Sequence, residues 1–580
     1  MGRVVVAGIC AAAVLATPMA ARGADLGLRG VTPEPPVTAP WNWSGLYIGT
    51  HTGAAAGVTE FPDVPGLASI FGDRVRTSGS IGGVQVGYDH QLNSLVLGIE
   101  AEVSAADLDG TNTCFAFSGD FSSANCRSHI DALGSVTGRL GWAAGGDGRT
   151  LLYLKGGAAW AHDKIDITIN DSFAFPPVIA STTVVRWGWT LGAGVQYALS
   201  PAWSAKLEYD YYGLGHANVA TPYTLNGAAF FDATAQNVHL IKLGMNYKLV
   251  GWPAGPGRLG GMLDKAPLPA APYHAAGWEI EAGVRYWGSW SRFQKDLGGF
   301  VGDVLPASAN VSRLTYDGMQ ANSGELFARV DNGSGIFVKG FIGGGGIAGG
   351  HMNDEDWAID IGNGPVEYSN TISAKVDGSN FYGTADAGYA VLRGPGYKVG
   401  PFIGYSYFRN KMQAFGCVQI ANPLSVCAPP FTFPTSVLGI TEDDTWQSLR
   451  LGSSAEVMLA PRLKLTADAA WLPYVKFNGT DHHIFLGSSI VAEVFPESGQ
   501  GTGVQLEAVL SYYLTDQLSI GVGGRYWAMR TTSGEWNCFG GLLCPAPTPP
   551  QIFRGTVEQA GVLVQAAYKF APPAPIVTKY

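Results

Sequence analysis

Apolar and polar side chains alternate along many segments of this chain, and the alternation is clearest around residue 245. One face of that segment carries Ile241, Leu243, Met245 and Tyr247, and the other carries Lys242, Gly244, Asn246 and Lys248. The segment around residue 566 repeats the pattern, with Val562, Val564, Ala566, Tyr568 and Phe570 on one face. Successive side chains of an extended strand point to opposite faces, so this period of two predicts β-strands.

Residues 41–249 contain eight such segments, which begin near Leu46, Ile81, Leu95, Ile130, Leu151, Val184, Ala202 and Gln236. Short turns alternate with long connections around 56–79, 105–129, 163–183 and 213–235. This rhythm is typical of an outer-membrane barrel, so we predict an eight-stranded transmembrane barrel over 41–249. Such a barrel is filled by its own side chains. We therefore interpret its inward-facing charges as a salt-bridge network rather than a channel lining: Glu100, Glu102, Arg139, Lys155, Lys206 and Glu208.

Residues 277–570 contain ten further segments and predict a second, ten-stranded barrel. The segments run near 278–292, 310–330, 336–348, 368–392, 397–413, 445–459, 463–478, 503–513, 518–529 and 557–570. Residues 250–276 are rich in Pro and Gly and are interpreted as a linker, and residues 571–580 as a C-terminal tail. The predicted fold class is all-β, with two transmembrane antiparallel β-barrels in tandem.

Composition agrees with export to a membrane. The chain has 580 residues, 46% of them hydrophobic and only 14% charged, with 80 Gly. Residues 1–24 have a basic start, an apolar core and small residues, which is typical of a signal peptide. Six of the seven cysteines form close pairs, interpreted as local disulfides: Cys114/Cys126, Cys417/Cys427 and Cys538/Cys544. The net charge of −10 argues against a nucleic-acid partner.

Two short polar motifs carry the candidate chemistry. The first is Asp354-Glu355-Asp356-Trp357, expected in the loop after the third strand of the second barrel, and the second is Asp481-His482-His483, expected at the end of its seventh. In extended chain, Asp354 and Asp356 share a face, as do Asp481 and His483. The pairs are expected on nearly opposite walls of a barrel roughly 20 Å across, where inward-reaching side chains close the gap. Three carboxylates and one imidazole there indicate a peptidase.

Other interpretations of these motifs remain open. The acidic run is also typical of a solvated loop tip or of a Ca²⁺ site, although the spacing lacks a known calcium-loop pattern. The Asp-His-His run is also compatible with ordinary rim polarity. His482 is expected to point outward, and Trp357 is interpreted as an anchor at the membrane interface. No cofactor and no metal is assigned.

Each half resembles a known family. The opening WNWSGLYIG and the ending LGMNYKLV make residues 41–250 similar to small alphaproteobacterial outer-membrane proteins of the opacity-protein type. Residues 278–570 resemble the omptins, ten-stranded outer-membrane proteases. The omptin resemblance rests on the strand count, on the long strand in VSRLTYDGMQANSGELFARVD, on Asp-x-Asp-Trp after the third strand and on Asp-x-His after the seventh.

The omptin resemblance implies roles for the motif residues. His483 would be the general base that takes a proton from water, Asp481 would orient it, and Asp354 and Asp356 would hold the water. One protonated Asp of that pair would donate to the oxyanion. Peptide or protein substrates at the cell surface and lipopolysaccharide are the implied partners, and the cell outer membrane the implied location.

The sequence departs from the omptin pattern at the acids that select basic substrates. One such position is Gly479, and another falls at Trp290, Ser291 or Arg292 on the first strand. The acidic specificity pocket is therefore expected to be missing. The alternative function is a non-catalytic outer-membrane surface protein of structural, adhesive or porin-like type.

Overall fold

The computed structural model describes residues 41–570 except for a set of connecting segments. The segments outside the description within that range are 62–73, 117–121, 146, 172–177, 226–227, 250–276, 301–309, 358–367, 395, 422–426, 428–431, 487–488 and 538–548. The predicted signal peptide, linker and tail therefore lie outside the described residues, as does the Cys538/Cys544 pair. Among the described residues, no helix combines the length and apolar character needed to cross a bilayer.

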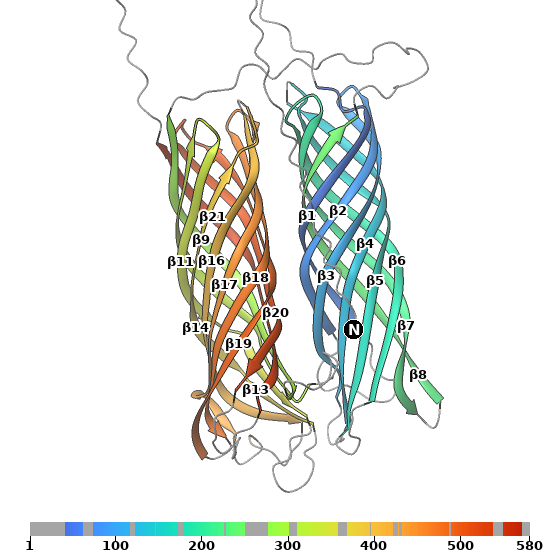
Figure 1. Cartoon of the computed structure of the whole chain (residues 1–580), viewed down its shortest axis with the longest axis vertical. Helices are drawn as coiled ribbons and strands as arrows, with labels where there is room; N and C mark the ends of the chain where they lie inside the picture. Colours follow the sequence, from blue (N-terminus) through green and yellow to red (C-terminus); the bar gives the residue numbers. More distant parts are fainter. Residues whose placement is uncertain are drawn as a thin grey trace, which may run out of the picture. The chain divides into compact units, whose positions relative to one another are not determined.

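The first barrel is a closed sheet of eight antiparallel strands, as predicted (Figure 1). Its strands are β1 (Gly45–Glu60), β2 (Arg74–Leu92), β3 (Leu95–Ala116), β4 (Ser122–Ala144), β5 (Thr150–Asp171), β6 (Val178–Ala198), β7 (Trp203–Leu225) and β8 (Ala228–Lys248). Pairing of β1 with β8 closes it, so no strand is left as an edge. The long loops expected around 105–129 and 213–235 are largely strand, because β3 and β4, like β7 and β8, continue to pair through them.

Buried ion pairs fill the interior of the first barrel. The ammonium of Lys155 lies 2.9 Å from Glu208 and 3.3 Å from Glu100, and Lys242 lies 2.6 Å from Glu102. Arg139 and Lys206 also contact Glu100, at 3.6 and 3.1 Å. All six residues of the predicted network are buried. The interpretation as a salt-bridge network is therefore confirmed.

The second barrel contains thirteen strands that occupy ten positions around its wall (Figure 1). They are β9 (Trp278–Phe300), β10 (Ser312–Asn332), β11 (Ile336–Ala348), β12 (His351–Asp356), β13 (Ser369–Ser373), β14 (Lys375–Tyr389), β15 (Leu392–Gly394), β16 (Tyr397–Ala421), β17 (Phe433–Ala460), β18 (Leu463–Leu486), β19 (Ser489–Tyr513), β20 (Leu518–Trp536) and β21 (Gln551–Phe570). Both β11 and β12 pair with β10, and β13, β14 and β15 all pair with β16. Pairing of β9 with β21 completes the ten positions.

Two predicted details of this barrel were wrong. Asp354 and Asp356 do not lie in a loop, because β12 pairs residue by residue with β10 and with β13. Strands six to eight also run further than predicted: β17, β18 and β19 keep pairing to Ile440↔His483 and His483↔Glu493. Both acidic motifs therefore stand on hydrogen-bonded strand, which fixes the direction of their side chains.

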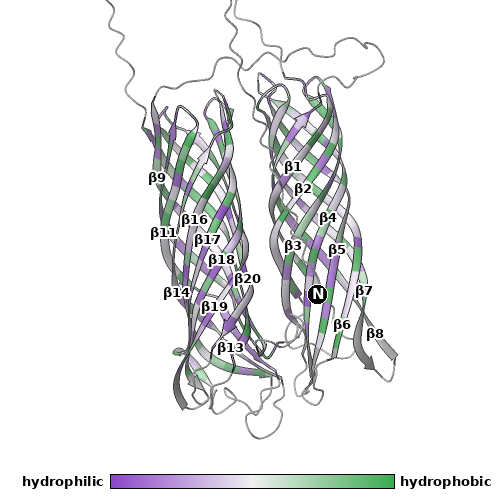
Figure 2. Ribbon diagram, in the orientation of Figure 1, coloured by the Kyte–Doolittle hydropathy of each residue, from purple (hydrophilic) through white to green (hydrophobic). Residues whose placement is uncertain are grey.

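Exposed apolar side chains form a band around the half of the second barrel in which β9 begins and β21 ends. Figure 2 shows hydrophobic and hydrophilic residues alternating along its strands. On β9 the band runs from Trp278 to Trp290, and on β18 it ends at Trp471 and Tyr474. An outward apolar band edged by aromatic residues is the lipid-facing surface of a transmembrane barrel. Asp481 lies beyond this band, separated from Tyr474 by roughly 20 Å of strand.

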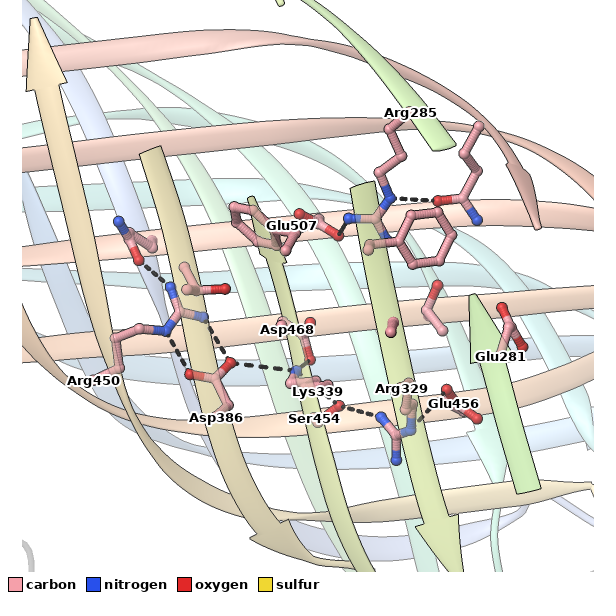
Figure 3. A pocket seen from close by; sticks show the side chains of 18 of the residues that line it. Glu281, Arg285, Arg329, Lys339, Asp386, Arg450, Ser454, Glu456, Asp468 and Glu507 are labelled. Atoms are coloured by element: carbon pink, nitrogen blue, oxygen red, sulfur yellow. Dashed lines mark hydrogen bonds and ion pairs between the residues drawn. The ribbon is translucent and has the colours of Figure 1, made fainter. Parts of the chain in front are cut away.

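Charged side chains fill the interior of the second barrel at the level of the band. They line a cavity of about 70 Å³ in which Arg450 pairs with Asp386 and Arg329 pairs with Glu456 (Figure 3). Higher up, the guanidinium of Arg525 lies over Phe341 (4.2 Å to the ring centroid) and Trp287 (4.7 Å). Charged and aromatic side chains thus fill much of the interior at this level, and the two candidate motifs lie nearer the rim.

Two disulfides join segments on the loop side of the barrels. Cys114 is bonded to Cys126 across β3 and β4, and Cys417 of β16 is bonded to Cys427. Both pairings agree with the prediction of local disulfides in an oxidising compartment.

Candidate active site

Strand β12 directs the first acidic pair into the barrel. Asp354 pairs with Leu314 and Asp356 with Ser312 on β10, and Leu314 is buried in the interior core. Residues directly opposite in an antiparallel pair share a face, so both carboxyls point inward. Glu355 takes the other face and accepts a hydrogen bond from the Tyr368 hydroxyl at 2.7 Å. Asp354, Glu355 and Asp356 therefore do not point toward one common position, which argues against the alternative of a calcium-binding loop.

Strand β18 directs the second pair into the same space. His483 Nε2 lies 3.0 Å from Asp481 Oδ2, a hydrogen bond within one strand between residues two apart. Asp481 is buried, whereas the His483 side chain keeps 15% of its surface exposed. The ring is further held by Phe495 of β19, whose ring centroid lies 5.5 Å from that of His483 in an edge-on arrangement. The imidazole is thus oriented on two sides and open on a third.

Electrostatic contact links the two pairs across the barrel. Burial raises the pKa of Asp354, and neighbouring His483 partly opposes that rise. In turn, the pKa of His483 is lowered by burial but raised more by Asp481 and Asp354, to about 9. The charges of Asp354 and His483 therefore influence each other, which brings the two pairs within electrostatic reach inside the barrel.

The four groups hold their protons with different strength. Burial and the adjacent Asp354 raise the pKa of Asp356 to about 8. Burial also tends to raise the pKa of Asp481, but His483 and Lys295 outweigh it and hold that pKa well below its usual range. Asp481 is thus favoured in its ionised form and Asp356 in its protonated form, a division that is typical of acid–base sites.

A buried lysine that the sequence motifs did not include contacts the dyad directly. Lys295 of β9 places its Nζ 2.7 Å from Asp481, 2.7 Å from Glu442 and 2.8 Å from Glu497. These three carboxyls have the mutual spacing of a cation site. The ammonium of Lys295 already occupies its centre, so the group holds a protein cation in the place where a metal would bind.

Neighbouring strands fill the space beside Gly479. A Cβ at this position would approach the Asp444 Oδ1 to 2.8 Å and the Glu497 Oε2 to 2.9 Å. Acidic groups are thus present beside the dyad, but they come from β17 and β19 and are buried. On β9, Trp290 is exposed on the outer surface and Ser291 is buried, several residues below the dyad. The residue at the level of the dyad is Lys295, which lies opposite Leu314.

Aromatic side chains separate the site from the charged interior below it. Phe477 lies 4.5 Å from Trp446 and 4.9 Å from Phe553, measured between ring centroids. Trp357, predicted as a membrane-interface anchor, instead packs against Tyr368 with ring centroids 5.8 Å apart. It lies beyond the apolar band, so its role is to brace the β12 segment.

Period-two spacing found the four motif residues because each pair lies within one strand. The residues that it missed are Lys295, Glu442, Asp444 and Glu497, which come from three strands. Alternation within β17 places Glu442 and Asp444 on one face and could have indicated an inward acidic pair. No local signal connects these acids to Lys295, which is 147 residues from Glu442 and 202 residues from Glu497 in the sequence.

Comparison with known proteins assigns the two barrels to two different families. The family model described as outer membrane protein beta-barrel domain matches residues 9–248, and the Omptin family model matches residues 342–539. The 31 kDa outer-membrane immunogenic proteins of Brucella melitensis and Brucella suis are each 33% identical over 225 residues, covering 37% of this chain and 89% of theirs. An uncharacterized protein of Coxiella burnetii is 26% identical over 241 residues, covering 37% of this chain and 86% of its own.

Solved structures show more distant likenesses. The outer membrane protease OmpT from Escherichia coli is 13% identical with a TM-score of 0.40, covering 50% of this chain and 97% of that one. The Ail protein of Yersinia pestis is 15% identical with a TM-score of 0.18, covering 36% of this chain and 99% of its own. At these values the likenesses carry no functional weight.

Proposed function

We propose that this chain, which belongs to the outer membrane protein β-barrel family through its first barrel and carries an omptin-family barrel as its second, is an endopeptidase of the cell outer membrane. The second barrel is of the omptin type and supplies the enzyme. Peptides or proteins at the cell surface are the proposed substrates. Lipopolysaccharide is the proposed lipid contact of the barrel surface.

One observation supports the proposal: His483 is hydrogen-bonded to Asp481 inside the barrel, beyond its lipid-facing band, and its charge influences Asp354 of the other motif. A neutral His483 that donates Nε2–H to Asp481 has Nδ1 free to take a proton from water. Asp481 then stabilises the imidazolium, because its own low pKa keeps it charged.

In the proposed reaction, Asp354 and Asp356 hold the water opposite His483. The water oxygen bonds to the peptide carbonyl carbon while His483 takes its proton. Protonated Asp356 donates a hydrogen bond to the developing oxyanion. The C–N bond then breaks, and His483 returns the proton to the leaving amine.

Cleavage of a diverse peptide library by the refolded full-length chain tests this proposal. We expect His483→Ala to lower the rate by about 10²-fold or more, and Asp481→Ala to lower it strongly. His482→Ala is the matched control, because alternation turns that neighbour away from the site, and it should keep the parental rate. Equal rates in the wild type, Asp481→Ala and His483→Ala would end the protease interpretation.

We propose a non-catalytic surface role for the first barrel. Its interior is filled by buried ion pairs among Lys155, Lys242 and the facing glutamates, which supports a solid barrel rather than a pore. The Brucella relatives of this half are named as outer-membrane immunogenic proteins, a description that fits exposure at the cell surface.

A further inference from the structure

A single buried ammonium lies at the centre of the acids beneath the dyad. Lys295 is fully buried, and its three carboxyl partners come from β17, β18 and β19, while the lysine itself comes from β9. Asp481 Oδ2 is shared: it lies 2.7 Å from the Lys295 ammonium and 3.0 Å from His483 Nε2. The oxygen that orients the imidazole is therefore itself held by Lys295.

Building on the function proposed above, we propose that Lys295 is the positioning residue of the reaction. It fixes the Asp481 carboxylate and keeps it, rather than its neighbours, in the ionised form. Glu442 and Glu497 accept hydrogen bonds from the ammonium and hold it in place. The fixed ammonium then contacts Asp481 as its third carboxyl partner.

The acids around Asp481 make such a cation necessary. Four carboxyls, of Glu442, Asp444, Asp481 and Glu497, are buried around one lysine. Neither Asp444 oxygen has a hydrogen-bond donor among the described residues, and one oxygen each of Glu442, Glu497 and Asp481 also lacks one. Crowded buried carboxyls do not all ionise, so protons distribute among them. Without a cation on Oδ2, a proton shared with Glu442 or Glu497 would be free to settle on Asp481 and remove the charge that His483 needs.

Proton affinities support this assignment. Burial raises the pKa of Asp444 and of Glu497 well above the ordinary range, and Lys295 only partly opposes it. For Asp481, burial is outweighed by His483 and Lys295. The carboxyl that touches both cations is thus the one that stays ionised.

Lys295 also acts on the base, and the sign of that effect provides a test. Its charge lowers the pKa of His483, opposing Asp481 and Asp354, which raise it. Removing the ammonium alone would raise the pKa of His483, but protonation of Asp481, which the proposal expects, removes the larger effect that raises that pKa. The charged and titratable groups that face this space are Lys295, Tyr316, Asp354, Asp356, Glu442, Asp444, Asp481, His483 and Glu497. A downward shift therefore reports that Asp481 has taken up a proton.

The test uses Lys295→Met in the full-length chain, because methionine keeps the length of the side chain and removes the charge. We expect kcat to fall by about 10-fold to 100-fold with KM within about threefold. The acid limb of the pH–rate profile should move down by roughly half a unit or more, because Asp481 loses its charge. Lys339→Met is the matched control: Lys339 is a buried lysine paired with Asp468 in the lower interior, and its loss should leave that limb in place.

A second variant guards against misfolding. In Lys295→Met/Glu442→Gln/Glu497→Gln, the carboxyls that lose their cation are also neutralised, which should restore the heat-modifiable gel mobility of a folded barrel but not kcat. The proposal would be overturned if either folded variant kept the parental kcat. It would also be overturned if kcat fell while the acid limb of the pH–rate profile stayed in place. His483→Ala is measured in parallel. If it is inactive while Lys295→Met is unaffected, only the role of Lys295 fails; if it is fully active, the protease function fails as well.

Discussion

At the scale of single residues, the proposed reaction needs a neutral His483 and a protonated Asp356, and few molecules carry both states at the same pH. The base must be neutral, and burial with Asp481 and Asp354 places the pKa of His483 at about 9. The oxyanion donor must be protonated, and burial with Asp354 places the pKa of Asp356 at about 8. In the proposed reaction only the small fraction of molecules that carries both states at once is active, so we expect activity on the alkaline side of neutrality.

The pH dependence of kcat/KM follows from these values. We expect a bell-shaped profile with its maximum between about pH 8 and 9, rising as His483 loses its proton and falling as Asp356 loses its own. Asp356→Asn keeps a neutral donor that does not titrate, so the falling limb should disappear while the rising limb stays. A profile of Asp356→Asn that still falls above pH 9 would contradict the role of Asp356 as the protonated donor.

Residue-level prediction from the sequence succeeded for pairs within one strand. The spacing of Asp354 with Asp356, and of Asp481 with His483, was enough to place each pair on one face. Lys295 was not found because its partners depend on the register of four strands, and pairing such as Glu442↔Asp481 is not visible in either strand alone.

At the scale of elements, the strands extend well past the apolar band and form a wall above it. β17 has 28 residues, β18 has 24 and β19 has 25, against the roughly 10 residues that cross hydrocarbon. Their upper parts were predicted too short because an inner face carrying Glu442, Asp444 and Gly479 no longer alternates with apolar residues. Backbone pairing rather than side-chain pattern sustains these extensions, and it makes the site rigid.

Close packing between these strands makes Gly479 intolerant of a side chain. Gly479→Asp would place Cβ against carboxyl oxygens of Asp444 and Glu497 and add a third buried acid. We expect the variant to lose about 1–3 kcal/mol of stability, measured by urea unfolding in detergent micelles. Gly479→Ala is the matched control, because it adds the Cβ at the same place without the carboxyl.

The charge and size contributions at Gly479 separate in a rescue experiment. Adding Asp444→Asn and Glu497→Gln to Gly479→Asp removes the like charges but keeps the volume. Partial recovery of stability is expected. A Gly479→Asp variant as stable as the parent would mean that β17 and β19 move apart at little cost.

At the scale of the whole molecule, each barrel is complete in itself. The first is closed by β1 with β8 and the second by β9 with β21, so neither needs a partner strand. Each also has its own interior, ion pairs in the first, and charged and aromatic layers in the second. The tandem of eight and ten strands was predictable because turns and alternation mark each strand. The prediction that the second barrel holds the candidate site depended on two short motifs.

Independent closure leads to an expectation for the separated halves. All four motif residues and Lys295 with its partners lie within residues 277–580, so a chain of those residues alone should fold and cleave peptides. We expect its kcat/KM to lie within about threefold of the full-length value, since no group of the proposed reaction has been removed. Residues 41–249 alone should fold but cleave nothing. Introducing His483→Ala into the isolated second barrel controls for contaminating proteases, because the activity must then vanish. A second barrel that folds, as judged by heat-modifiable mobility, yet cleaves more than tenfold more slowly would show that the first barrel contributes to the site.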